Sequence, residues 1–365
     1  MNSARVPGVE RRAFGSLPSG ESSQLFTVAS SSGVIVKITD YGGIIVSILA
    51  PDREGYFSDI VLGHDDLGGY LDNEPYFGAL IGRVANRIAG AQFVLDGVTY
   101  HITPNEGRHA LHGGVRGFDQ ALWKAESFER ERERGVKLTH VSPDGDQGFP
   151  GELRAEVTYT LSDLDELAID YAAQSQRATL VNMTQHSYFN LSGQQDRDIL
   201  DHIATIPADR YLPVDSEFIP TGALTSVAGS AFDFRNPRRF GEFIHSPDPQ
   251  ISLAKGYDHN FVLNNAYSGL ALAARIEDKA SGRLLEVRTS EPGVQLYTAN
   301  QLDGAIVGKA QLHYEQYAGF ALETQHFPDS AHHPEFPSIV LQPGRTLRSR
   351  TVYRFATTGA AESVT

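Results

Sequence analysis

The chain has 365 residues and a formal net charge of −14 at pH 7, and it contains no cysteine. The charge disfavours nucleic acid and anionic membranes as partners, and the lack of cysteine excludes disulfides, thiolate nucleophiles and Cys-type zinc sites. No apolar run approaches the ~20 residues of a membrane helix and no secretory signal is evident, so we expect a cytoplasmic protein without a membrane partner.

The first patterned segments are short. "DDLGGYLDN" (65–73) predicts one helical turn, and "PYFGALIGRVANRI" (75–88) fits either a helix or a buried strand. "AQFVLDGVTYHI" (91–102) places Asp96-Gly97 between two β-rich arms. This is a strong hairpin signature, because glycine tolerates the positive φ of a tight turn.

The remainder of the chain is also rich in strand patterns. "RAEVTYTLSDLDELAIDYAAQ" (154–174) predicts a second hairpin. Residues 274–300 predict three strands, with turns at Ser281-Gly282 and Pro292-Gly293. The C-terminal segment 341–356 alternates as one more strand, and "NPRRFGEFI" (236–244) predicts a short helix with Pro237 near its first position.

"TQHSYFNLSG" (184–193) has two different faces when it is read with period two. Phe189 and Leu191 share a mostly apolar face, whereas His186 lies in a row of hydrogen-bonding side chains on the other. A strand of this kind predicts a sheet with hydrogen-bonding side chains on one face and the hydrophobic core against the other. We therefore predict an all-β fold, one large antiparallel sandwich domain spanning residues 1–365 with its core at about 13–356.

Four segments combine turn residues with groups that can do acid–base chemistry. They contain His112 before two glycines, Asp258 in "KGYDHNFVL", Glu323 in "GFALETQ", and Arg87 in "GRVANRIAG". Each also has a purely structural interpretation: a turn histidine, a turn carboxylate, or an arginine paired with Asp258 or Glu323. Glu323 follows apolar residues, and a buried carboxylate needs either a cleft or a cationic partner.

Metal and cofactor sites are not expected. His326 and the pair His332-His333 match no zinc spacing, and adjacent strand residues point to opposite faces. No serine lies in a nucleophile elbow, and no glycine-rich loop has the phosphate-binding form.

Taken together, the segments resemble the aldose 1-epimerase family, the galactose mutarotases. The resemblance runs from near residue 13 to near residue 356. The segments that carry it, in chain order, are "GRVANRIAG", "LHGGVRGFD", "TQHSYFNLSG", "YLPVDSEFIPTG", "GYDHNFVL", "PGVQLYTAN" and "ALETQHFPD". It implies a β-sandwich of the galactose-mutarotase type with the sugar in an open cleft on a sheet face.

The resemblance also implies residue roles. Glu323 matches the catalytic base and His186 the catalytic acid. The positions that match sugar-binding residues are Asn86, Arg87, His112, Ser187, Tyr188, Asp258 and Gln295. The implied partner is a small free aldohexose, with no metal or other cofactor, and we expect a monomer or a weak dimer.

The expected chemistry opens and closes the sugar ring. A base takes the proton of the C1 hydroxyl while an acid protonates the ring oxygen, and a carboxylate with an imidazolium suits these roles at neutral pH. Three alternatives remain open. Asp258 and Glu323 could be the carboxylate pair of a glycoside hydrolase, or the protein could be a sugar-binding module without catalysis. The third is a relative that acts on hexose phosphates, although Arg87 is the one clear arginine in these motifs and a phosphate favours several cations.

Overall fold

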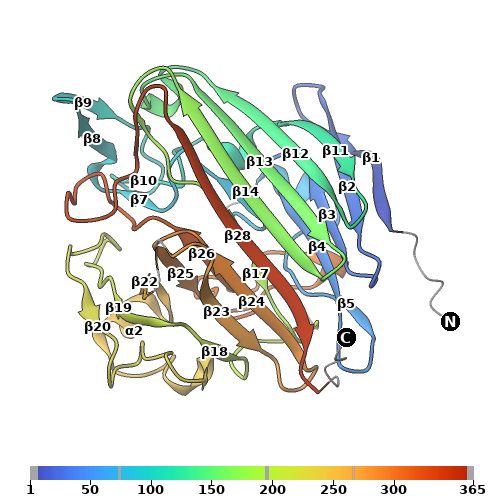
Figure 1. Ribbon diagram of the computed structural model, residues 1–365. Coiled ribbons are helices and arrows are strands. Elements are labelled where there is room, and N and C mark those ends of the chain that lie inside the picture. Colours follow the sequence, from blue (N-terminus) through green and yellow to red (C-terminus); the bar gives the residue numbers. More distant parts are fainter. Residues whose placement is uncertain (1–6, 73–74, 194–196, 265, 267, 360–365) are drawn as a thin grey trace.

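The computed structural model describes residues 7–359, apart from 73–74, 194–196, 265 and 267 (Figure 1). Strands dominate this part of the chain, and its α-helices are the short α1 (Gly68–Leu71) and α2 (Pro249–Ala254). Among the described residues, no helix is long and apolar enough to cross a bilayer. Single 3₁₀ turns lie at Ala89–Ala91, Phe118–Gln120, Asp146–Gly148, Phe240–Glu242 and Lys309–Gln311.

A nine-stranded antiparallel sheet forms one side of the molecule. Its long strands cross the front of Figure 1 diagonally. In spatial order it contains β11 (Lys124–Glu129), β12 (Glu133–Ser142), β13 (Leu153–Ser162), β14 (Glu166–Ser175), β28 (Thr346–Thr357), β24 (Arg283–Thr289), β23 (Ala271–Glu277), β18 (Ile203–Thr205) and β21 (Arg238–Arg239).

Two further antiparallel sheets lie opposite it across the core. The six-stranded sheet contains β17 (Tyr188–Phe189), β26 (Phe320–Gln325), β25 (Gly293–Tyr297), β22 (Asp258–Leu263), β19 (Ala208–Tyr211) and β20 (Thr225–Ser226). The five-stranded sheet contains β1 (Gly8–Ser16), β2 (Ser22–Ala29), β3 (Ile35–Thr39), β4 (Ile45–Pro51) and β5 (Phe57–Asp59).

Four short pairs complete the strands. They are β6 (Ala79–Ile81) with β16 (Thr184–His186), β7 (Arg87–Ile88) with β10 (Ala110–Leu111), β8 (Gln92–Leu95) with β9 (Val98–His101), and β15 (Thr179–Leu180) with β27 (Val340–Leu341).

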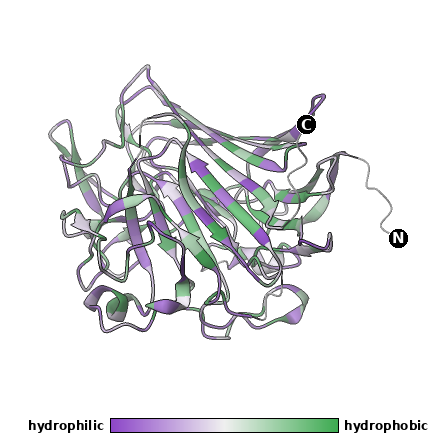
Figure 2. Ribbon diagram, turned by 60° about the horizontal axis from the view of Figure 1, so that its bottom comes forward, coloured by the Kyte–Doolittle hydropathy of each residue, from purple (hydrophilic) through white to green (hydrophobic). Residues whose placement is uncertain are grey.

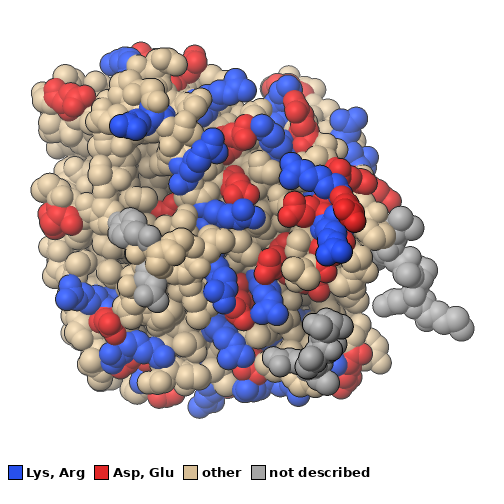
Figure 3. All heavy atoms as spheres, in the orientation of Figure 1, with Lys and Arg blue, Asp and Glu red and all other residues tan. Residues whose placement is uncertain are grey.

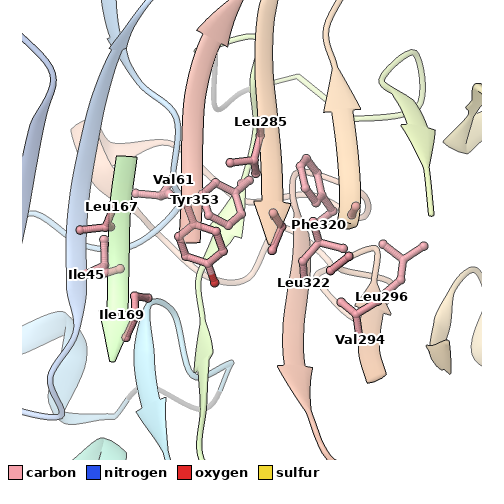
Figure 4. Packing of buried hydrophobic residues seen from close by; sticks show 14 of the residues in the cluster. Ile45, Val61, Leu167, Ile169, Leu285, Val294, Leu296, Phe320, Leu322 and Tyr353 are labelled. Atoms are coloured by element: carbon pink, nitrogen blue, oxygen red, sulfur yellow. The ribbon is translucent and has the colours of Figure 1, made fainter. Parts of the chain in front are cut away.

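The main hydrophobic core fills the space between the sheets (Figure 4). Ile45 reaches it from the five-stranded sheet, Ile169 and Leu285 from the nine-stranded sheet, and Leu296 and Phe320 from the six-stranded sheet. All five side chains are fully buried. Hydrophilic and hydrophobic residues alternate along many strands in Figure 2, as a sandwich with one packed face per sheet requires.

This alternation places the polar face of the six-stranded sheet away from the core. On β25, Val294 and Leu296 belong to the core cluster, so the intervening Gln295 and the following Tyr297 point to the other face. Leu322 is likewise a core residue of β26, and Glu323 follows it on the outer face. A carboxylate that follows an apolar strand start is thereby directed into a cleft.

Both predicted hairpins are confirmed. Leu95 pairs with Val98 around Asp96-Gly97, and β13 pairs with β14 along their whole length. The ambiguous segment 75–88 contains the short strands β6 and β7, and a helical turn forms at Gly68–Leu71 as predicted.

Two local predictions were wrong. "TQHSYFNLSG" is two short strands in different sheets, because β16 pairs with β6 whereas β17 pairs with β26. The two faces are otherwise as predicted, with Phe189 and Leu191 in the core and His186 and Tyr188 lining a cleft. Thr184 and Asn190 instead donate to the backbone carbonyls of Thr324 and Ala318. The segment after Pro237 is the strand β21 and a 3₁₀ turn, since pairing with β18 prevails over the helical pattern.

Candidate active site

A cleft of about 410 Å³ opens on the polar face of the six-stranded sheet. Its walls come from the ends of several strands and from the loops that follow them. The lining residues are Pro75, Tyr76, Asn86, Arg87, Glu106, Leu111, His112, His186, Tyr188, Asp258, Tyr297, Gln301, Leu302, Asp303, Ala305, Ile306 and Glu323. The cleft is therefore mixed in character, with carboxylates, imidazoles and aromatic rings around one space.

Glu323 and His186 meet in this cleft. Nε2 of His186 lies 3.6 Å from Oε1 of Glu323, and both side chains are buried. Glu323 comes from β26 and His186 from the end of β16, so the sheet structure brings together residues that are far apart in the chain. Oε2 of Glu323 has no hydrogen-bond partner in the described part of the chain.

Burial acts on the two groups in opposite directions. It raises the pKa of Glu323 to about 8, and the nearby Asp258 raises this pKa further while Arg87 lowers it. It lowers the pKa of His186 to about 4. Burial therefore favours a neutral Glu323 and a neutral His186 near pH 7, whereas the sequence alone suggested a carboxylate and an imidazolium.

His112 has a defined tautomer. Its Nδ1 accepts the backbone N–H of Asn86 over 3.1 Å, so the ring proton of the neutral form is on Nε2. Burial and the neighbouring His186 hold the pKa of His112 well below its usual range. Its ring lies edge-on to that of His186, with 5.3 Å between the centroids. His112 is thus a neutral hydrogen-bond donor.

The same tautomer bears on metal binding. One ligand atom each from His112, His186 and Glu323 lie within 4.8 Å of one another, a spacing that a cation could bridge. A histidine whose Nδ1 accepts a hydrogen bond, however, has no lone pair on Nε2 to give to a metal. The donor chemistry of the cluster therefore disfavours a metal centre.

Asn86 and Arg87 form one wall. Arg87 makes a two-point ion pair with Glu106: Nε and Nη2 each donate over 2.6 Å. Asn86 adopts a φ of +60° and accepts the backbone N–H of Arg87 on its own Oδ1. The sequence suggested Asp258 or Glu323 as the partner of Arg87. Asp258 and Glu323 favour the charged form of the Arg87 guanidinium through space, but Glu106 accepts its hydrogen bonds.

Asp258 lines the cleft at the start of β22, and Gln295 does not line it. Nε2 of Gln295 donates to Oδ1 of Asp258 over 2.7 Å. Burial raises the pKa of Asp258, while Arg87 and the bond from Gln295 lower it. Gln295 lies behind the wall, where it fixes the orientation of the carboxylate.

Of the two residues that follow His186, only Tyr188 lines the cleft. Its ring stacks on His186 with centroids 5.0 Å apart, and its hydroxyl donates to the carbonyl of Pro75. Ser187 is buried outside the lining, and its N–H bonds to Oε1 of Gln185. The alternation that points Tyr188 inward directs Ser187 away.

Sequence reasoning did not single out several lining residues, among them Tyr76, Tyr297 and Glu106. Period two on β25 could have identified Tyr297, since it shares a face with Gln295. Tyr76 and Glu106 lie in irregular segments without such a signal. The remaining histidines considered from the sequence lie outside the cleft: His326 bonds to Glu291, and His332 to Asp329, at 2.6 Å each.

This cleft defines a class of protein: a β-sandwich with a buried carboxylate–imidazole pair in a cleft lined by polar side chains. Comparisons with known proteins give the family. The family model described as aldose 1-epimerase matches residues 24–354. Human galactose mutarotase is 47% identical over 96% of this chain and 99% of its own. The aldose 1-epimerase of Escherichia coli (strain K12) is 38% identical over 93% of this chain and 96% of its own.

Solved structures agree with the sequence relatives. The galactose 1-epimerase of Lactobacillus acidophilus NCFM superposes with a TM-score of 0.86 at 27% identity, over 96% of this chain and 99% of its own. The GalM/aldose epimerase homologue of C. elegans gives 0.84 at 30% identity, over 92% and 99%. The chain belongs to the aldose 1-epimerase family.

Proposed function

We propose that this protein interconverts the α and β anomers of free aldohexoses such as galactose and glucose, with Glu323 and His186 as its proton-transfer pair. The contact between these two side chains in a cleft of polar residues carries the proposal. Its relatives named galactose mutarotase and aldose 1-epimerase support the reaction class.

In the proposed reaction the carboxylate of Glu323 takes the proton of the C1 hydroxyl. His186 gives a proton to the ring oxygen, the C1–O5 bond breaks, and an open-chain aldehyde forms. Rotation about C1–C2 turns the other carbonyl face to the hydroxyl, and the two proton transfers then run in reverse. The pair ends with the one proton that it held at the start, so no co-reactant is needed.

The pKa directions of Glu323 and His186 indicate the protonation state of the pair before the reaction. Between the two titrations it holds one proton, and the raised pKa of Glu323 with the lowered pKa of His186 favours this proton on Glu323. The reactive form has this proton on His186. Sugar hydroxyls that donate to Oε2 of Glu323, which has no partner among the described residues, stabilise the carboxylate and so favour this form.

The other lining residues have proposed roles in sugar binding. His112 donates from Nε2, and Arg87 donates from its guanidinium. Asn86 and Asp258 offer oxygen acceptors, and Tyr188 offers an aromatic face beside the acid. We assign Gln295 to the support of Asp258. Ser187 lies outside the lining and receives no binding role here.

Arg87 is the only lysine or arginine among the described lining residues, and Glu106 already neutralises it. Glu106, Asp258 and Asp303 leave the cleft electronegative. A phosphate group favours several cations, so the geometry supports unphosphorylated sugars.

Polarimetry of freshly dissolved α-galactose and α-glucose tests the function. The protein is expected to speed the approach to anomeric equilibrium, and a rate equal to the spontaneous one would leave a sugar-binding module as the better description. Aryl galactosides test the hydrolase alternative. An epimerase releases no aryl group, since a glycoside has no C1 hydroxyl proton for Glu323 to take.

We further propose that the chain works as one domain, as a monomer or weak dimer in the cytoplasm, with no nucleic-acid or membrane partner. Its main core cluster runs from Phe26 to Phe355, which supports the single domain. Figure 3 shows basic and acidic side chains interspersed over the face with β12–β14 and β28. Net charge of −14 supports the absence of polyanionic partners.

A further inference from the structure

The Arg87 guanidinium is held on two sides by residues that the family resemblance did not assign. Its Nε and Nη2 edge donates to both oxygens of Glu106 over 2.6 Å each. The ring of Phe218 lies over one face, with Cζ 5.1 Å from the ring centroid. The Arg87 side chain is 8% exposed, so these contacts define most of its surroundings.

The opposite edge of the guanidinium is left for the cleft. In the part of the chain that the structure describes, Nη1 donates no hydrogen bond to the protein, and Arg87 lines the same space as Glu323 and Asp258. A guanidinium is a rigid planar fork. Fixing the Nε and Nη2 edge therefore fixes the direction of the Nη1 donors.

Two loops supply these contacts, and each is internally braced. Glu106 follows Asn105, whose side chain accepts the N–H of Leu111 and donates to its carbonyl. Phe218 has a φ of +60°, a strained conformation for a bulky residue. Oδ1 of Asp215 accepts the N–H of Ile219 and stabilises this turn. The strained turn keeps the ring over Arg87.

We propose that Glu106 and Phe218 are positioning residues, which hold the Arg87 guanidinium so that its Nη1 donors meet sugar hydroxyls. Glu106 fixes the in-plane direction of the fork and Phe218 fixes its plane. Neither residue moves a proton of the reaction. Their removal therefore weakens sugar binding and leaves proton transfer at Glu323 and His186 largely intact. The proposal rests on the proposed function of the cleft.

The experiment compares Glu106→Gln, Phe218→Leu and Arg87→Met. KM and kcat for galactose are measured by polarimetry, and binding of the unreactive methyl β-galactoside by calorimetry. Glu106→Gln is expected to raise KM about tenfold with kcat within about threefold, as for the loss of a charge-assisted hydrogen bond. Methyl galactoside should bind weaker by the same factor. Phe218→Leu should raise KM about threefold.

The matched control is Glu217→Gln. Glu217 pairs with the exposed Arg108 and neighbours Phe218, but it does not contact Arg87. This variant should stay within twofold of the wild type. The Glu106→Gln/Arg87→Met double variant should be no weaker than Arg87→Met alone, because Glu106 acts through Arg87.

Two results would overturn the proposal. In the first, Glu106→Gln and Phe218→Leu both bind methyl β-galactoside with an affinity within twofold of the wild type. In the second, the losses of affinity in Glu106→Gln and Arg87→Met multiply in the double variant. Failure of the proposed function looks different. In that case the wild type shows no anomer exchange, while the binding measurements still report on Arg87.

Discussion

Gln295 and Asp258 are joined across neighbouring strands, since Nε2 of Gln295 donates to the Asp258 carboxylate over 2.7 Å. Only Asp258 reaches the cleft. Gln295→Met keeps the side-chain length but removes this donor. KM for galactose should rise about three- to tenfold with a smaller change in kcat, since one neutral-to-charged hydrogen bond is lost. A change confined to kcat, measured by polarimetry, would place Gln295 in the proton-transfer chemistry instead.

Glu323→Gln retains the shape of the side chain but cannot accept the C1 hydroxyl proton. Its kcat should fall by about 10²–10⁴, the usual contribution of a general acid or base. His186→Asn should lose a similar factor. The double variant should be little worse than the poorer single one, because residues that act as a unit are not additive. Near-normal turnover in folded Glu323→Gln, checked by circular dichroism, would return the base assignment to Asp258.

The same Glu323→Gln variant should be more stable than the wild type. The folded-state pKa of Glu323 is about 8, raised from an ordinary 4.5. Ionisation therefore costs folding free energy, beginning as the pH rises above about 4.5 and levelling off above about 8. At pH 7 the difference should reach up to about 3 kcal/mol, since one pKa unit is about 1.4 kcal/mol. Urea unfolding at pH 4.5 and pH 7 measures it, and an equal difference at both would contradict the burial argument.

The pH dependence of kcat/KM should be bell-shaped, with limbs near pH 4 and pH 8. Below the lower limb both groups hold protons and no base remains; above the upper limb neither does, and no acid remains. The ordinary pKa values of the two side chains would give the lower limb to the glutamate, and burial reverses this order. Because the groups are in contact, both values belong to the pair. A profile that stays flat from pH 5 to pH 10 would exclude Glu323 as the upper limb.

Metal removal should leave the activity unchanged. Dialysis against a chelator followed by polarimetry checks this. The prediction follows from the His112 tautomer, whose Nε2 proton blocks the lone pair that a cation would need. Recovery of lost activity on addition of zinc would show that His112 changes tautomer in the active protein.

Local chemistry made much of the fold predictable. Asp96-Gly97 gave a hairpin because its turn geometry is encoded in two residues, and β13 and β14 kept strict alternation. The break between His186 and Tyr188 was not predictable, since period two runs through it unchanged. Their strands differ only in partner, β6 for one and β26 for the other, and partner choice is a tertiary property.

Some residues of the candidate site could likewise be predicted from the sequence, whereas others depend on tertiary contacts. Glu323 and His186 were identified through the family resemblance, and the structure brings them into contact. Glu106 was missed because its contact with Arg87 joins a loop to a strand end, which no periodicity reports. Ser187 and Gln295 stay predictions as sugar-binding residues, and both lie outside the cleft lining. A motif names neighbours in sequence, whereas alternation and cross-strand contacts decide which of them line the cleft.

The alternation on β26 couples catalysis to strand register. Leu322 faces the core and Glu323 the cleft, and Gln295 lies opposite Glu323 on β25. A one-residue insertion or deletion in this strand would exchange the two side chains, with a carboxylate among aliphatic groups and a leucine beside His186. Misregistered molecules would thus be inactive as well as unstable. The rate of anomer exchange would serve as an assay for correct strand pairing during refolding.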